Sequence, residues 1–214
     1  MSGSEGVIKF DLDVRPGPAP PAGWLRELDA WRELFRRLGL LGQDPRRYDG
    51  FGFGNLSRRR PDADDHSFVI SATQTGGLPR LTPADYVLVE TCDPARNRVR
   101  ATGMSRPSSE ALSHAVVYQT CAAIDWVMHL HSPDIFRAGA RLGLPGTDPA
   151  AAYGSVAMAA EIRGLVSQTL PDKPLLLVMT GHQDGILACG GDADTVGALV
   201  VTTLAQALCE AAAS

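Results

Sequence analysis

Three of the five histidines in this 214-residue chain lie where metal ligands are commonly found. In the segment from residue 124 to residue 131, the alternation of a β-strand directs His129 and His131 to one face and turns Leu130 into the core. Two imidazoles placed in this way can chelate one ion, and neutral imidazole nitrogen suits zinc and its first-row neighbours. His182 lies in a polar turn after a buried strand, where it serves packing poorly. Three histidines with an open coordination position are typical of a catalytic metal site.

A predicted helix start supplies a carboxylate and a place for an anion. Glu110 follows two serines at this helix N-terminus, where the first backbone N–H groups have no partner within the helix and the dipole favours negative charge. Two further polar turns, at residues 55–57 and 75–76, are of the kind that holds phosphate or carboxylate. Each turn alone is more often ordinary loop structure, so its meaning depends on the histidines. The groups predicted to bind the anion are Asn55, Thr75, Gly76, Ser108 and Ser109.

The charge balance of the chain disfavours polyanionic partners. Lys and Arg number 20 against 24 Asp and Glu, a formal net charge of -4, so neither nucleic acid nor an anionic membrane is expected as a partner. The basic run 58–60 is followed by Asp62, Asp64 and Asp65, which predicts a solvated loop that neutralises itself. No apolar stretch approaches the length of a membrane-spanning helix, and no signal-peptide core precedes residue 10. The four cysteines lack C-x-x-C spacing, which indicates reduced thiols in a cytoplasmic protein. The candidate metal site makes a small molecule the expected partner.

The elements that must position these groups begin after a proline-rich segment. Residues 1–22 are predicted to be a flexible N-terminal arm, and residues 23–214 a single domain. Residues 48–57 are dense in glycine and predict a turn, without the sequence context of a dinucleotide-binding fold. Helices inserted singly between strands indicate a central mixed or antiparallel sheet with helices on both faces. The predicted helices are 24–38, 109–123, 156–170 and 195–211, and the predicted strands are 68–71, 86–90, a short one around 99, 124–131, 175–179 and 185–188.

Five short motifs occur in an order that is specific in combination. They are Gly54-Asn55-Leu56-Ser57, Thr73-Gln74-Thr75-Gly76, Pro107-Ser108-Ser109-Glu110, His129-x-His131 and Gly181-His182. This order resembles that of the class II aldolase/adducin family over roughly residues 25–210. The resemblance implies an α/β fold, a three-layer αβα sandwich around a central mixed, largely antiparallel sheet. It also implies a homo-oligomer, because family members commonly form cyclic tetramers with active sites between neighbouring subunits.

The resemblance implies a role for each matched residue. His129, His131 and His182 would bind a divalent metal ion, with Zn²⁺ expected first and Mn²⁺ or Co²⁺ as alternatives. Glu110 would be a fourth, weaker ligand that leaves the metal when substrate binds and then acts as general acid and base. The five polar groups named above would hold a phosphate or similar anion of the substrate. His114, one helical turn after Glu110, is expected at the helix surface or as a hydrogen-bonding support for a neighbour.

The implied chemistry is that of a metal-dependent lyase. A metal ion chelated by the carbonyl and adjacent hydroxyl oxygens of a substrate acts as a Lewis acid and stabilises an enediolate. We expect retro-aldol cleavage of a small hydroxy-carbonyl or sugar-like compound, with or without a phosphate, as in carbohydrate metabolism. A glutamate at position 110 favours a lyase, since the sugar-phosphate 4-epimerases carry aspartate there.

Other reactions on the same scaffold stay open. The loop at residues 141–149 lacks the tyrosine that sugar-phosphate aldolases use, and Tyr153 beyond it is interpreted as structural. A dehydratase, decarboxylase or epimerase would differ only in which bond the enolate chemistry breaks. A non-catalytic, adducin-like assembly module is the remaining alternative, and an intact set of four ligands counts against it.

Overall fold

The structure is a computed structural model that describes residues 7–63, 66–169 and 173–212. Its main feature is one eight-stranded sheet with the strand order β1-β7-β6-β5-β4-β8-β10-β9. Within it β1 pairs parallel with β7, and the other neighbouring strands pair antiparallel. The strands are β1 (Asp11–Pro16), β4 (Asn55–Arg59), β5 (Phe68–Ser71), β6 (Tyr86–Asp93), β7 (Arg98–Gly103), β8 (Trp126–His131), β9 (Leu175–Val178) and β10 (Gly185–Gly190). A separate small pair joins β2 (Gly42–Gln43) to β3 (Gly52–Phe53).

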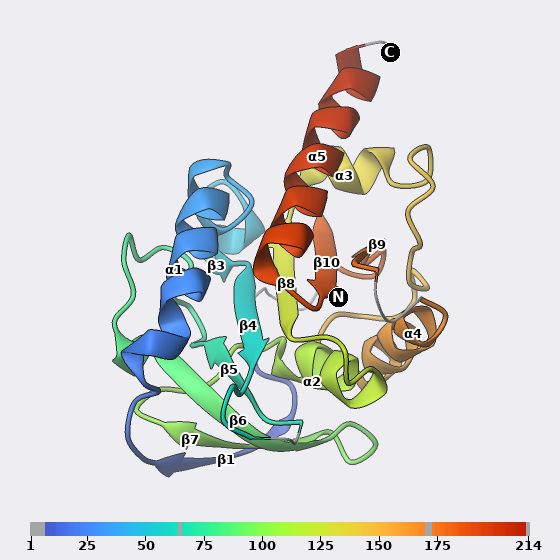
Figure 1. The fold of residues 1–214 in the computed structure, drawn as a ribbon. Coiled ribbons are helices and arrows are strands. Elements are labelled where there is room, and N and C mark those ends of the chain that lie inside the picture. The colour runs from blue at the N-terminus through green and yellow to red at the C-terminus, as the bar shows by residue number, and fades with distance from the viewer. Residues whose placement is uncertain (1–6, 64–65, 170–172, 213–214) are drawn as a thin grey trace.

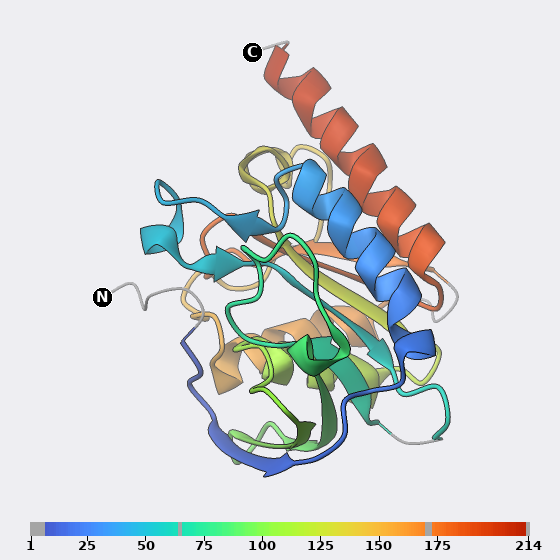
Figure 2. The same cartoon turned by 90° about the vertical axis from the view of Figure 1, so that its left-hand side faces the viewer.

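Helices cover both faces of this sheet (Figures 1 and 2). One hydrophobic core lies between the sheet and α2 and α4, and a second lies between the sheet and α1, α3 and α5. The helices are α1 (Ala22–Arg37), α2 (Ala111–Thr120), α3 (Pro133–Ala138), α4 (Val156–Ser167) and α5 (Ala193–Ala212). The predicted three-layer sandwich with a mixed, largely antiparallel sheet is therefore confirmed.

Strand β8 lies near the middle of the sheet and is buried along its whole length. Its side chains alternate between the two cores: Val127 contributes to the core under α2 and α4, whereas Met128 and Leu130 contribute to the core under α1, α3 and α5. The same alternation places His129 and His131 on the α2 side of the sheet, as a period of two residues requires. Burial from both sides also explains why the other four residues of β8 are apolar.

The prediction of a flexible arm is wrong for residues 11–16, which form the edge strand β1 (Figure 2). Leu12 and Val14 alternate with charged residues and pack on the core, a period-two pattern that the neighbouring prolines obscured. Arg98 and Arg100 of β7 reinforce the pairing through ion pairs with Asp11 and Asp13. Residues 17–21 of the predicted arm form no regular element, and residues 1–6 lie outside the described part.

The predicted turn at residues 48–57 is also only partly correct. Gly50 and Gly54 adopt positive φ values of 77° and 78°, as turns require, but residues 55–59 form β4 between β5 and β8. Asparagine and serine are poor strand formers, and pairing on both sides outweighs that local preference. The sequence prediction also lacked the short helix α3, which begins after Ser132 with a proline at its first turn.

Helix α5 is longer and more apolar than the sequence analysis allowed. Among the described residues it alone could cross a membrane by length and composition, and 28% of its most apolar stretch is buried. It packs against α3, α1 and β10, and its C-terminal part extends past the rest of the chain (Figure 1). The expectation that no stretch reaches such a length is therefore wrong for residues 193–212.

Candidate metal centre

The structure brings His129, His131 and His182 together in a buried cluster. Each offers a ring nitrogen, and the three nitrogens lie within 4.8 Å of one another. The Nε2 atoms of His129 and His131 are 3.1 Å apart. Two nitrogens bound to one tetrahedral zinc at the usual bond length of about 2.0–2.1 Å would be roughly 3.3 Å apart. The donor set and its spacing therefore fit a single divalent metal ion.

The neighbouring strand β10 fixes the ring of His129. The Nδ1 of His129 lies 3.0 Å from the carbonyl oxygen of Ile186 on β10, so an Nδ1–H donates there and leaves Nε2 as the ligand atom. Burial holds the pKa of His131 well below its usual range, and it also lowers the pKa of His182. Both rings are consequently neutral at pH 7, which is the form that binds a metal.

His182 reaches the cluster from the tight turn between β9 and β10. Its backbone N–H donates to Met179 (2.8 Å) and its carbonyl accepts from Gly185 (2.9 Å), which folds residues 179–185 back on themselves. Asp184 in this turn adopts a φ of 57°. A Cβ on Gly185 would lie 3.0 Å from the Cγ atom of the His182 ring, so a larger residue at 185 would press on the imidazole and displace it.

Glu110 lies at the start of α2, near His182. Its side chain is buried, and Ser113 donates a hydrogen bond of 2.7 Å to its Oε2. Its negative charge opposes the effect of burial on the pKa of His182, which shows that the two groups are close. It is not one of the three residues whose ligand atoms lie within 4.8 Å of one another. The structure thus places this carboxylate near the histidine cluster but outside it.

The predicted anion-binding groups lie on β4 and on two loops that contact each other. Asn55 is opposite His129 in the β4–β8 ladder, and its buried Oδ1 has no hydrogen-bond partner among the described residues. The 73–76 loop meets the start of α2 through a bridge between Ala72 and Pro107 and a 3.0 Å hydrogen bond from the Thr73 N–H to Arg106. The structure thus brings the two predicted loops side by side.

The hydroxyl groups of these loops already make local hydrogen bonds. Thr75 donates to the Ala72 carbonyl (2.8 Å), and Ser108 accepts from the backbone N–H of Glu110 (3.2 Å). Ser109 is buried, and Gly76 packs so closely on Gly42 that a Cβ would collide with its carbonyl. An anion here would therefore meet the backbone N–H groups of ordered turns and the Ser108 hydroxyl, which accepts one hydrogen bond and can donate another.

A buried arginine holds one of these loops. Arg32 on α1 is 3% exposed, and its Nη2 donates to the carbonyl oxygens of Thr75 (2.7 Å), Gly76 (3.3 Å) and Leu78 (2.7 Å). These hydrogen bonds attach the carbonyl side of the loop to α1. Sequence reasoning missed this residue because it lies on the apolar stripe of a predicted core helix.

His114 and two tyrosines lie around the histidine cluster. His114 is fully buried and its Nδ1 is 2.7 Å from the Ser57 hydroxyl, so it supports a neighbour by a hydrogen bond and does not lie at the helix surface. The ring of Tyr48 meets His131 edge-on with centroids 4.6 Å apart, and its hydroxyl donates to Asp184 (2.9 Å). Tyr153 stacks on His182, also at 4.6 Å. Sequence reasoning missed Tyr48, since its glycine-rich surroundings gave no signal beyond a turn.

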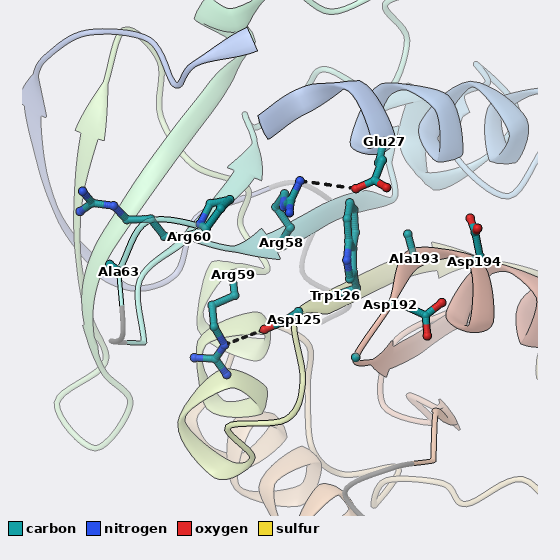
Figure 3. A pocket seen from close by; sticks show the side chains of 12 residues that line it. Glu27, Arg58, Arg59, Arg60, Ala63, Asp125, Trp126, Asp192, Ala193 and Asp194 are labelled. Atoms are coloured by element: carbon teal, nitrogen blue, oxygen red, sulfur yellow. Dashed lines mark hydrogen bonds and ion pairs between the residues drawn. The ribbon is translucent and has the colours of Figure 1, made fainter. Parts of the chain in front are cut away.

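A separate polar pocket of about 450 Å³ lies at the opposite end of β8, beside Trp126 (Figure 3). That end is roughly 16 Å from His131, at about 3.3 Å per residue. Arg58 and Arg59, predicted to lie in a solvated loop, belong to β4 and form ion pairs with Glu27 (3.5 Å) and Asp125 (3.2 Å). The prediction is wrong for these two residues because β4 pairs on both sides.

The end of the same basic run behaves as expected. Arg60 forms an ion pair of 2.6 Å with Asp62, while Asp64 and Asp65 lie outside the described residues. The cations that line this pocket are therefore matched by carboxylates, and the pocket adds nothing to the histidine cluster.

Comparison with known proteins identifies the family. The class II aldolase and adducin N-terminal domain matches residues 43–212, so the chain belongs to this family. It is 39% identical over 109 residues to methylthioribulose-1-phosphate dehydratase of Gluconacetobacter diazotrophicus, a match that spans 49% of this chain and 47% of that protein. Class II aldolases generally use a divalent metal ion, and family members bind small molecules and often form oligomers.

Two solved structures illustrate the shared fold. L-Fuculose-1-phosphate aldolase from Thermus thermophilus superposes with a TM-score of 0.64 at 17% identity, covering 88% of this chain and 92% of that one. A sugar-phosphate aldolase from Thermotoga maritima gives a TM-score of 0.63 at 13% identity, covering 87% and 92%. At these identities the likeness concerns the fold alone.

Proposed function

We propose that the protein is a metal-dependent lyase that acts on a small hydroxy-carbonyl or sugar-like substrate. The observation that carries this proposal is the cluster of three buried histidine nitrogens within 4.8 Å of one another. A cluster of neutral imidazoles in a protein interior has little structural value without an ion to bind. Membership of the class II aldolase and adducin family supports the same conclusion.

His129, His131 and His182 would hold the metal, with Zn²⁺ expected first and Mn²⁺ or Co²⁺ as alternatives. The ion would supply Lewis acidity, polarising the substrate carbonyl and stabilising an enediolate. Glu110 would move the proton, since it lies at a helix N-terminus beside the histidines and is buried from water. The anion of the substrate would bind at the surrounding turns, through Asn55, Thr75, Gly76, Ser108 and Ser109.

Retro-aldol cleavage is the first candidate reaction. A base removes the proton of the hydroxyl group on the carbon next but one to the carbonyl, the carbon–carbon bond breaks, and an aldehyde leaves. The remaining enediolate then takes up a proton to give the second carbonyl product. Glu110, a buried carboxylate, would carry both proton transfers.

Dehydration is the second candidate, and the match to a methylthioribulose-1-phosphate dehydratase favours it. Here the base removes a proton from the carbon beside the carbonyl, and the hydroxyl of the next carbon leaves as water after taking up a proton. Both reactions pass through an enediolate, so one site serves either of them. They differ in the products, which are two fragments for cleavage and one dehydrated molecule plus water for elimination.

The test is to load the purified protein with zinc, manganese or cobalt and to supply ketose 1-phosphates, including L-fuculose 1-phosphate and methylthioribulose 1-phosphate. Mass spectrometry of the products separates cleavage into two fragments from loss of water. Glu110→Gln is the matched control, because it keeps the size of the side chain and removes its basicity. A well-folded protein that binds no metal and converts none of these compounds would instead support a non-catalytic, adducin-like module.

We also propose a homotetramer in the cytoplasm. Light scattering of the metal-loaded protein tests the assembly, with a mass of four chains expected and a monomer contradicting it.

A further inference from the structure

A lysine from the N-terminal segment lies on an aromatic ring that in turn lies on a candidate metal ligand. The Lys9 ammonium is 3.4 Å from the centroid of the Tyr153 ring and donates a 3.0 Å hydrogen bond to the Tyr153 carbonyl oxygen. The Tyr153 ring stacks on His182 with centroids 4.6 Å apart and planes 25° apart. Tyr153 and His182 are both buried, at 5% and 3% exposure. The three groups thus form a continuous stack that ends at the histidine cluster.

The Lys9 end of the stack is anchored to the fold. The backbone of Lys9 is held by Asn97, whose side-chain amide donates to the Lys9 carbonyl oxygen (2.8 Å) from the turn between β6 and β7. Phe10, the next residue, is buried in the core under α2 and α4. The position of the ammonium therefore follows from the docking of β1 on β7.

The loop that carries Tyr153 is pressed onto the turn that carries His182. A Cβ on Gly181 would collide with the carbonyl oxygen of Ala151, so glycine at 181 permits this close approach. Gly154, on the other side of the tyrosine, adopts a φ of 64°. Because backbone and ring both contact the turn, the orientation of Tyr153 limits the orientations open to His182.

We propose that Tyr153, held in place by Lys9, is a positioning residue that sets the ring plane of His182 for metal binding. The inference rests on the proposed metal centre. An imidazole donates its lone pair in the plane of the ring, so a rotated ring moves the ligand nitrogen away from the ion. The strand histidine His129 has a hydrogen bond to β10 that fixes its ring, whereas His182 is on a turn and stacks against the rings of His129 and Tyr153. The residues that support ligands in this way are typically on neighbouring elements, as Lys9 and Tyr153 are.

The test measures metal binding rather than turnover. Zinc affinity is obtained by competition with a chromophoric chelator, and the visible absorption of the cobalt-loaded protein reports the ligand geometry. Tyr153→Leu, which removes the aromatic ring, is expected to weaken zinc binding about 10- to 100-fold and to change the cobalt spectrum. Tyr153→Phe keeps the ring and should bind zinc as the unmodified protein does.

Lys9 is tested by a parallel pair with a matched control. Lys9→Met should weaken zinc binding about two- to fivefold, the range of a cation–π contact at an exposed site, and Lys9→Arg should restore it. Lys173, the only other lysine of the chain, is exposed, so Lys173→Met makes the same chemical change elsewhere and should leave zinc binding unchanged.

The outcomes separate this inference from the proposed function. Unchanged zinc affinity and cobalt spectrum in Tyr153→Leu, or equal losses in Tyr153→Leu and Tyr153→Phe, would overturn the role of the ring. Equal effects of Lys9→Met and Lys173→Met would overturn the role of Lys9. If Tyr153→Leu does not fold, the Lys9 pair still decides. His182→Ala must abolish most zinc binding, and if it does not, the metal centre itself is wrong.

Discussion

Buried histidines cost stability unless their ring nitrogens find partners, and this chain buries four of them. His114 uses Ser57, and His129 uses a β10 carbonyl. One ring nitrogen from each of His129, His131 and His182 lies within 4.8 Å of the other two, which is the arrangement that a metal ion would complete. Burial thus has a chemical consequence, because it keeps the candidate ligands neutral and ready to bind.

Replacement of Glu110 tests the carboxylate. Glu110→Gln keeps the volume of the side chain and its contact with Ser113, but it removes the group that can take up a proton. We expect the turnover rate on any substrate found above to fall about 10²- to 10⁴-fold, the usual contribution of general acid–base catalysis. Metal content, measured by elemental analysis, should persist, because three histidines remain. Unchanged turnover would mean that another group moves the proton.

The buried histidines also predict how the stability of the metal-free protein depends on pH. Burial holds the pKa of His114 well below that of an unfolded chain, which is about 6.5. Below pH 6.5 the unfolded chain therefore binds a proton that the folded protein does not. The free energy of unfolding is therefore highest above this pH. It falls as the pH drops, by up to about 1.4 kcal/mol per pH unit for this histidine.

Urea unfolding between pH 7.5 and 5.5 measures this effect. His114→Gln should lose stability less steeply than the unmodified protein. His66→Gln removes an exposed histidine and should follow the unmodified curve. Identical slopes for the two variants would contradict the assignment to His114.

The residues of the histidine cluster could be predicted from sequence better than their supports. His129 and His131 share a face because a strand has a period of two, which is a local property. Tyr48, Tyr153 and Lys9 reach the cluster through loops or an edge strand whose paths depend on tertiary packing. Even the conformation of Tyr48, with a φ of 51°, is imposed by its surroundings and has no sequence signal.

Among the elements, α1 gives a sharp prediction through Arg32. Its guanidinium donates to three carbonyl groups of the 75–78 loop, so Arg32→Met leaves buried acceptors without a donor. We expect a loss of about 2 kcal/mol in the free energy of unfolding and weaker binding of phosphorylated substrates. Arg37→Met removes an exposed arginine, 72% exposed, from the same helix and should change stability by less than about 0.5 kcal/mol. Equal losses in urea unfolding would contradict the role assigned to Arg32.

Element prediction failed where long-range pairing outweighed local preference. The buried strands and the helices with apolar stripes were found because their patterns are periodic, although α2 proved shorter than the predicted 109–123. β4 was missed because its polar residues resemble a turn, and β1 because a proline-rich segment follows it directly. The partner of β1 and one of the two partners of β4, strand β8, lie far along the chain, where a local pattern carries no information.

For the whole molecule, metal binding should raise thermal stability. The candidate ligands join β8 to the turn before β10, so an ion would bind the folded chain and not the unfolded one. At a free zinc concentration 1,000 times the dissociation constant, the gain is about 4 kcal/mol and roughly 10 °C in Tm. Thermal denaturation with and without a chelator measures it, and His182→Ala serves as the control that should show no shift. A Tm independent of zinc in the unmodified protein would contradict the metal centre.

The parallel pairing of β1 with β7 also constrains the order of events during synthesis. Asp11 and its partner Arg98 are 87 residues apart, so β1 leaves the ribosome long before β7 exists and cannot pair until then. The histidine cluster closes later still, once residue 182 has been made. The nascent chain must therefore keep its first strand unpaired through nearly half of translation, and any metal capture by all three histidines belongs to the final stage of folding.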